Sequence, residues 1–424
     1  MSSTRARSAR SGRGCVRSTA AAFGVALGVW LCAAVGVDPA QAQETLRAEI
    51  GRPLKAAEEL IKARRYKEAL AKVHDAEAVP GRSAHENFVI ERMRMAAVSG
   101  AGDLDEAVRS FEALSGSDRL PSADRLRMIE SIAGGYYRER DYARAAQWAQ
   151  RYLREGGGNA AIRTLLIQSQ YLAGDYAAVL KELGTELQAA ERSGNAPAED
   201  RLKLMLNAAL KAGDNSAYVR AMEKLVAYYP KQEYWGELLG RLQRKPGFSD
   251  RLALDAYRLA LATGSMGSAD DYMEMAQLAL QAGMAAEAEQ VLQKGFAGGM
   301  LGKGPQAERH QRLRNLVAKR LAEDRQRSAE LEREAHEAKD GGELLKIGMN
   351  RVYRGDAGQG IALMQQGIAK GDLKRPEDAR LHLGIAYLLA GDSAKGLATL
   401  KTVGGNDGTG DLARLWMLYA RRKG

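Results

Sequence analysis

Apolar residues recur three and four positions apart along most of this chain, in stretches separated by short polar breaks. That spacing places apolar side chains on one face of a helix. Around Asp141, for example, Ile129 and Tyr136 precede the break, and Tyr142 and Ala145 follow it. We therefore expect amphipathic helices that are joined in pairs by tight turns.

The breaks themselves return at a nearly constant interval of about 36 residues, with two steps close to a double interval. Their turn signals are Arg64-Arg65-Tyr66, Gly102-Asp103-Leu104, Arg140-Asp141-Tyr142, Gly174-Asp175-Tyr176, Gly213-Asp214, Gly283-Met284, Gly355-Asp356 and Gly391-Asp392. A fixed period of this size is typical of stacked helical hairpins, because one hairpin cannot bury its apolar face alone. The pattern predicts an all-α solenoid of about ten hairpins.

Proline positions support the same register, because proline is tolerated where a helix starts and disfavoured inside it. The prolines expected between hairpins are Pro53, Pro80, Pro121, Pro197, Pro230, Pro305 and Pro376. Pro246 lies elsewhere, beside Gly247, and marks the concealed turn within a hairpin that the first double interval requires.

The second double interval covers residues 306–339, which contain no glycine or proline and many charges. Two structures fit this segment: a hairpin with a polar turn at 322–324, or one long solvated helix. A glycine-rich run over 295–304 precedes it, so we expect a joint and a break in the solenoid over 295–340. This divides the chain into an N-terminal solenoid over 43–294 and C-terminal hairpins over 341–424, ending in a capping helix at 411–422.

The first 42 residues carry the features of an export signal. Five arginines precede an uncharged stretch at 20–37, and Ala40-Gln41-Ala42 offers a cleavage site. We expect a Sec-type signal and a periplasmic protein, although the apolar stretch is also long enough to remain as an anchor. Both cysteines, Cys15 and Cys32, fall in this leader, so the chain from residue 43 has no disulfide, thiol nucleophile or cysteine metal site.

Composition and motifs point away from nucleic-acid binding and catalysis. The net charge of +10 includes the arginine-rich leader, and the remaining excess is mild. The run at 297–304 lacks the first glycine and the Ser or Thr of a phosphate-binding loop. The histidines form no metal-binding pattern and are expected on helix surfaces; they are His74, His85, His310, His336 and His382. We predict no catalytic residue, metal site or cofactor, with a composite enzyme site from separate hairpins left open.

One unit carries a more specific pattern, consisting of Leu383-Gly384, Tyr387, Gly391-Asp392 and Gly396. The unit around Asp141 has similar spacing. Over residues 52–403 the chain resembles the tetratricopeptide repeat (TPR) family. The resemblance implies a TPR-like α-solenoid, a right-handed superhelix in which small residues let paired helices approach closely and the first helix of each hairpin lines the concave side.

Projecting the first helices of the third to fifth units gives a candidate protein-binding groove of basic, amide and aromatic groups. Its residues are Arg127, Tyr137, Arg138, Thr164, Gln168, Tyr171, Lys203, Asn207 and Lys211. Such groups can hold an extended or helical peptide by its backbone and carboxylates. The alternative is an ordinary solvated face.

The segment from Tyr228 to Trp235, with the divergent hairpin after it, resembles periplasmic TPR proteins that work with TonB-type systems. The resemblance implies an exported, non-enzymatic adaptor, a component of a TonB/ExbB/ExbD-type transport system. The alternatives are an adaptor for outer-membrane protein insertion or polysaccharide export, and an envelope enzyme. Tyr234 and Trp235 can equally be core aromatics that open a helix.

Overall fold

The computed structural model describes residues 45–421, and within them it contains 21 α-helices and no strand. The predicted leader lies outside the described residues. The chain divides into two compact units, Met1–Ile162 and Arg163–Gly424. None of the described helices is both long enough and apolar enough to cross a membrane.

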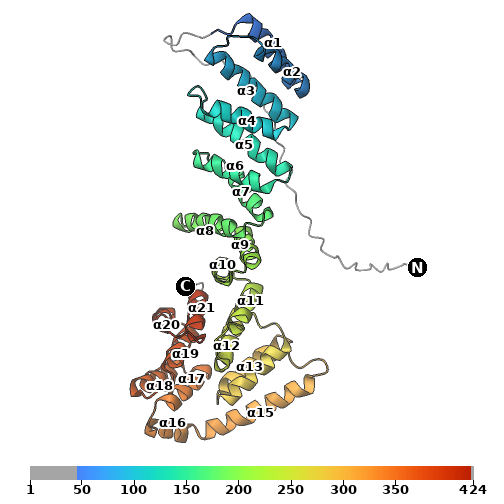
Figure 1. The fold of residues 1–424 in the computed structure, drawn as a ribbon. Helices are drawn as coiled ribbons and strands as arrows, with labels where there is room; N and C mark the ends of the chain where they lie inside the picture. Colours follow the sequence, from blue (N-terminus) through green and yellow to red (C-terminus); the bar gives the residue numbers. More distant parts are fainter. Residues whose placement is uncertain (1–44, 422–424) are drawn as a thin grey trace, which may run out of the picture. The chain divides into compact units, whose positions relative to one another are not determined.

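Three helical hairpins form the described part of unit 1 (Figure 1). Their helices are α1 (Ala48–Lys62), α2 (Tyr66–Glu77), α3 (Ala84–Ala101), α4 (Leu104–Ser115), α5 (Ser122–Arg138) and α6 (Tyr142–Arg154). Helix α7 (Ala160–Leu172) begins at the boundary and continues into unit 2.

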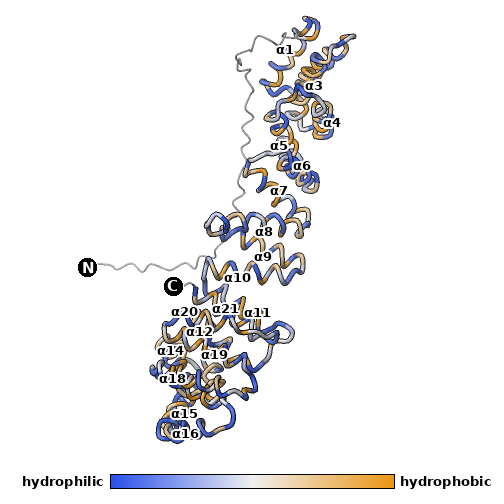
Figure 2. Tube along the Cα trace, turned by 90° about the vertical axis from the view of Figure 1, so that its left-hand side faces the viewer, coloured by the Kyte–Doolittle hydropathy of each residue, from blue (hydrophilic) through white to orange (hydrophobic). Residues whose placement is uncertain are grey.

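Unit 2 continues the series of helices. They are α8 (Tyr176–Arg192), α9 (Glu199–Ala212), α10 (Asn215–Tyr228), α11 (Gln232–Gln243), the short 3-10 helix η1 (Asp250–Leu252), α12 (Ala253–Thr263), α13 (Ala269–Gln281), α14 (Ala285–Ala297), α15 (Ala307–Gln326), α16 (Ser328–Glu337), α17 (Gly342–Tyr353), α18 (Ala357–Lys370), α19 (Pro376–Leu389), α20 (Ser393–Leu400) and α21 (Thr409–Arg421). Figure 2 shows hydrophilic and hydrophobic stretches alternating along these helices, as amphipathic packing requires.

The turn signals form the turns that the sequence predicts. Gly102 ends α3 in the left-handed conformation, and the Asp103 side chain accepts a hydrogen bond from the backbone of α4. Arg140 takes the glycine position in the third turn with φ of 63°, and Asp141 caps α6. The register of the hairpins is therefore confirmed. The concealed turn near Gly247 is also present, between α11 and α12.

Small residues let paired helices approach closely, as the family resemblance implies. A methyl group on Gly348 of α17 would lie 2.5 Å from the carbonyl oxygen of Gly360 in α18. One on Gly384 of α19 would lie 2.6 Å from Leu400 of α20. The described chain thus has the TPR-like architecture of helical hairpins packed in series.

The proline prediction needs one correction. Pro53 lies inside α1 rather than before it, because α1 already starts at Ala48. Pro53 is the sixth residue of α1, so its missing N–H removes the hydrogen bond that would run to the carbonyl oxygen of Glu49. The other prolines lie between helices or, as with Pro376, at a helix start.

The segment over 295–340 contains two helices. The turn considered at 322–324 is absent, because α15 runs without interruption to Gln326 and α16 starts at Ser328. The alternative of one long solvated helix over 306–339 is also wrong, because Arg327 interrupts the segment and one side of α15 is buried. Leu313, Val317 and Leu321 are buried, and the hydrophobic core of unit 2 continues through this segment.

Helix α21 does more than cap a solenoid end. It packs against α19 and α20, and it also contacts α10 and α12, about 160 to 190 residues earlier in the chain. Trp416 and Leu412 lie in the same core as Trp235. The helices from α11 to α21 therefore close on themselves, which the expectation of an open capped end did not include.

Candidate functional site

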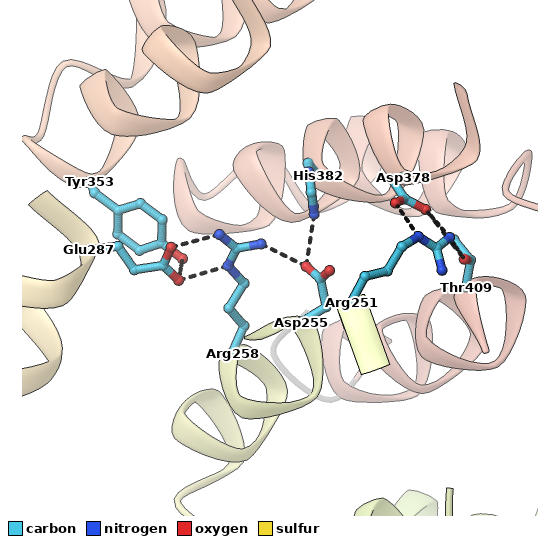
Figure 3. Close-up of polar contacts among 8 residues, drawn as sticks. All are labelled: Arg251, Asp255, Arg258, Glu287, Tyr353, Asp378, His382 and Thr409. Atoms are coloured by element: carbon cyan, nitrogen blue, oxygen red, sulfur yellow. Dashed lines mark hydrogen bonds and ion pairs between the residues drawn. The ribbon is translucent and has the colours of Figure 1, made fainter. Parts of the chain in front are cut away.

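Closure of unit 2 brings charged groups from four helices into its interior (Figure 3). We call Asp255, Arg258, Glu287, Tyr353 and His382 the buried charge cluster. The Arg258 guanidinium donates two hydrogen bonds to the Glu287 carboxylate, at 2.7 and 2.6 Å, and one to Asp255 at 2.6 Å. His382 Nε2 lies 2.9 Å from Asp255, and the Tyr353 hydroxyl donates to Glu287 at 2.9 Å.

Burial and charge act in opposite directions on this cluster. Burial alone would raise the pKa of Asp255, but the neighbouring His382 and Arg258 outweigh it and lower that pKa. Burial alone would lower the pKa of Arg258, but the carboxylates of Glu287 and Asp255 outweigh it and raise that pKa far above its usual value. The Arg258 cation is therefore paired with the carboxylate anions of Asp255 and Glu287, and buried charges are stable in a protein only when they are paired in this way.

A second set of polar contacts fixes the same closure. Arg251 of η1 donates to Asp378 of α19 at 2.7 and 3.0 Å and to Asp407 at 2.8 Å. The backbone N–H of Ser249 donates to the carbonyl of Asp407 at 2.9 Å. These contacts and the buried charge cluster bind α12 and its flanking loop to α19 and to the start of α21. Their role is to hold unit 2 closed.

The predicted groove residues of unit 2 lie on two neighbouring first helices. Thr164, Gln168 and Tyr171 are on α7, and Lys203, Asn207 and Lys211 are on α9. Residues 164 and 168 of α7 correspond to 203 and 207 of α9 in the next repeat. Both helices contribute to one apolar cluster, through Ile167 and Met205.

Some of these groups are already engaged by the protein itself. The Thr164 hydroxyl accepts a hydrogen bond from Arg201 at 3.0 Å. Tyr171 packs edge-on against Tyr176, and Lys203 pairs with Glu199 at 3.1 Å. Asn207 and Lys211 are exposed.

Two leucines on these helices were not among the predicted residues. Leu172 is 50% exposed and Leu210 is 60% exposed. Each occupies the last turn of its helix, beside Tyr171 and Lys211 respectively. We call Thr164, Gln168, Tyr171, Leu172, Lys203, Asn207, Leu210 and Lys211 the α7–α9 face. Helical projection contained the signal, but only the structure shows that both leucines remain uncovered.

The three predicted residues of unit 1 lie on α5. Arg127 pairs with Asp124 one turn earlier, and Tyr137 packs edge-on against Tyr142 with ring centroids 5.6 Å apart. Arg138 is the last residue of the helix and is exposed. An arginine there also suits the partial negative charge of a helix C-terminus.

The aromatic residues Tyr234 and Trp235, from the segment that resembles TonB-associated proteins, pack in the hydrophobic core of unit 2. Trp235 of α11 is fully buried in this core. The Tyr234 hydroxyl donates to Glu199, which also accepts from Lys231 at 2.6 Å. Hydrogen bonds from Lys231, and then from Tyr234 and Lys203, lower the pKa of Glu199 to about 2. The interpretation as core aromatics that open a helix is confirmed.

One histidine departs from the predicted surface positions, and a second, His382, is 30% exposed but turned towards Asp255. His310 is buried, and its Nδ1 accepts a hydrogen bond from the backbone of Gly302 at 3.1 Å. His382 belongs to the buried charge cluster. The packing of α15 and α19 against other helices sets the positions of these two histidines. A search for sequence motifs cannot detect such packing. Among the described residues no group of three acidic, histidine or cysteine side chains is arranged to hold a metal ion.

The chain is similar to solved structures of helical-repeat proteins, but it matches no family model and no curated protein. Among solved structures, the chain is similar to the TPR domain of P58(IPK), with 12% identity, 88% of this chain and 98% of that chain covered, and a TM-score of 0.22. Yeast Tom70 is 10% identical, with 88% of this chain and 96% of that chain covered and a TM-score of 0.23. The apo form of RapI is 9% identical, with 88% of this chain and 98% of that chain covered and a TM-score of 0.20. At these TM-scores the fold assignment rests on the turns and helix contacts described above.

Proposed function

We propose that this chain is an exported, non-enzymatic scaffold that binds segments of other proteins on the α7–α9 face. One observation carries the proposal: exposed leucines on α7 and α9 accompany the exposed amide of Asn207 and the exposed ammonium groups of α9. A surface of this kind provides an apolar anchor, and polar groups for the backbone or carboxylates of a bound segment. A preformed face loses little conformational entropy when it binds.

The binding proposal is tested by charge reversal. Lys211→Glu on α9 and Arg138→Glu on α5 are purified separately, and partner binding is measured by titration. We expect Lys211→Glu to weaken binding about tenfold, because a repulsive carboxylate replaces an attractive ammonium group. Lys181→Glu on the neighbouring helix α8 is a matched exposed control. Unchanged affinity of the Lys211→Glu variant would refute binding on the α7–α9 face. Unchanged affinity of Arg138→Glu, which lies on unit 1, would remove only Arg138 from the predicted binding residues.

The narrower proposal is that the scaffold serves a TonB/ExbB/ExbD-type transport system in the periplasm. Its support is the leader at 1–42 and the resemblance of the Tyr228–Trp235 segment, whose aromatic residues contribute to packing. Cross-linking in intact envelopes followed by purification tests it. Enrichment of TonB-, ExbB- or ExbD-like proteins is the expected result. Their absence, with other envelope proteins enriched, contradicts the TonB proposal and leaves the scaffold proposal standing.

Export has its own test. The N-terminal residue of the protein recovered from the periplasmic fraction should be Gln43, if cleavage follows Ala42. A protein that keeps residue 1 and stays in the cytoplasm would refute the localisation.

A further inference from the structure

Helix α15 differs from the other first helices of unit 2. It has 20 residues, so it extends about 30 Å. In the neighbouring hairpins the second helix folds back along the first, as α14 does on α13 and α18 on α17. Helix α16 packs far less extensively on α15, and Arg327 alone separates the two (Figure 1). One side of α15 therefore lacks the helix that a regular hairpin would place there.

The packed side of α15 is clearly defined. His310, Leu313, Val317 and Leu321 are buried, and α15 contacts α13 and α14. A different side carries Leu316, which is 53% exposed and so leaves a large apolar side chain in water. A single exposed leucine is common on protein surfaces, but the charged residues around Leu316 indicate a binding surface.

The residues around Leu316 are basic. Between positions 309 and 320 the sequence has five cations and no acidic residue. The Arg314 guanidinium makes a cation–π contact with Phe296, 4.9 Å from the centroid of the ring. The other four share one helix face with Leu316, at intervals of three, four and seven residues, and we call this set the α15 basic face. Its members are Arg309, Arg312, Leu316, Lys319 and Arg320.

The protein pairs two of the four cations of this face with acidic residues. Arg312 lies 3.5 Å from Glu308 and Arg320 lies 3.1 Å from Glu323, and all four side chains are exposed. Such exposed pairs contribute at most about 1 kcal/mol, so they leave the cations available. Arg309 and Lys319 form no ion pair with any residue that the structure describes. By contrast, Lys346 and Arg380 on other helices of unit 2 pair with acids one turn away.

We propose that the α15 basic face is a docking surface for an acidic amphipathic helix of a partner protein. Charge complementarity identifies the occupant: glutamates or aspartates flank an apolar stripe, and the stripe covers Leu316. The bound helix takes the place of the missing second helix of the hairpin. This surface is separate from the α7–α9 face, so its failure would leave the proposed function untouched.

The test uses the full chain and a synthetic helical peptide with a leucine stripe between rows of glutamates. Binding is measured by fluorescence anisotropy, with a peptide in which lysines replace the glutamates as the opposite-charge probe. We expect the acidic peptide to bind and the basic peptide not to bind. Raising the salt concentration from 50 to 500 mM should weaken binding at least about fivefold, because the contacts are exposed charges.

Variants then locate the site. Arg312→Glu with Lys319→Glu, and separately Leu316→Asp, should each weaken binding about tenfold or more. Arg325→Glu is the matched control, because Arg325 is an exposed cation on another side of the same helix. Circular dichroism checks that each variant keeps its helical content.

Three results would overturn the proposal. The first is an affinity for the acidic peptide no greater than for the basic one. The second is an equal loss in Arg325→Glu. The third is binding to vesicles of anionic phospholipid, lost in the Arg312→Glu and Lys319→Glu variant, without binding of the peptide; this would make the face a lipid-binding surface.

Discussion

Replacing Arg258 by methionine should destabilise unit 2 more than any surface substitution. The guanidinium holds two carboxylates, and Asp255 is only 3% exposed while Glu287 is fully buried. Methionine fills much of the same space but leaves Glu287 without a cation and Asp255 with His382 as its remaining partner. Removal of one partner from a buried ion pair costs about 3 to 5 kcal/mol. With the usual urea dependence, this lowers the unfolding midpoint by about 1 to 2 M.

Tryptophan fluorescence measures this change where it occurs. In a Trp148→Phe background, the tryptophans left in the described chain are Trp235 and Trp416, and both lie in the core of unit 2. Arg325→Met provides the surface control and should shift the free energy of unfolding by no more than about 0.5 kcal/mol. A triple variant, Asp255→Asn, Arg258→Met and Glu287→Gln, removes every charge together and should recover at least about 2 kcal/mol.

The pH dependence gives an independent check. In the unmodified protein the pKa of Asp255 is lowered, so the stability it contributes is present above the unfolded value of about 3.9 and is lost as the pH falls below it. A buried carboxyl without a cation has a raised pKa instead. The folded variant then takes up protons between pH 7 and 5 that the unfolded chain does not, so its deficit should shrink as the pH falls. A deficit below 1 kcal/mol at pH 7, or one independent of pH, would refute the reasoning.

Three further predictions concern packing and charge elsewhere. Gly348→Ala should lower the free energy of unfolding, measured by thermal unfolding, by about 1 to 3 kcal/mol, because the new methyl group meets the backbone of α18. The control Gly358→Ala meets nothing within 4 Å and should be neutral or slightly stabilising. Equal effects of the two substitutions would contradict this. Hydrogen bonds from Arg47 and the Ser83 backbone lower the pKa of Glu86 to about 2, so Glu86→Gln should lower the stability of unit 1 at pH 7, with the difference fading between about pH 4 and pH 2. The control Glu59→Gln, at an exposed position, should show no such pH dependence. Trp416→Ala should cost about 3 to 5 kcal/mol and expose the chain after Lys401 to trypsin, whereas Trp148→Ala in unit 1 should leave that cleavage rate unchanged.

The repeat architecture was predictable because its determinants are local. A glycine or arginine in the left-handed conformation, followed by an aspartate cap, fixes each turn within a few residues, as at Gly102 and Arg140. The spacing of apolar residues then fixes which side of each helix is buried. Even the turn near Gly247 followed from the interval alone.

Closure of unit 2 was not predictable, because it depends on contacts between residues far apart in the chain. Asp255 and His382 are 127 positions apart, and neither belongs to a recognisable motif. Sequence periodicity gives the next hairpin in the series but not the curvature that brings α21 back to α12. The exposure of Leu172 and Leu210 likewise depends on what neighbouring helices leave uncovered, which a single sequence does not encode locally.

Site-specific photo-cross-linking tests the central claim most directly. A photoreactive amino acid replaces Asn207 on the α7–α9 face, and in a separate strain it replaces Lys181 on α8. After irradiation of intact cells, the account predicts a discrete cross-linked protein from position 207, reduced strongly by Lys211→Glu and absent from position 181. The same products from both positions, or products at 207 that Lys211→Glu leaves unchanged, would contradict it.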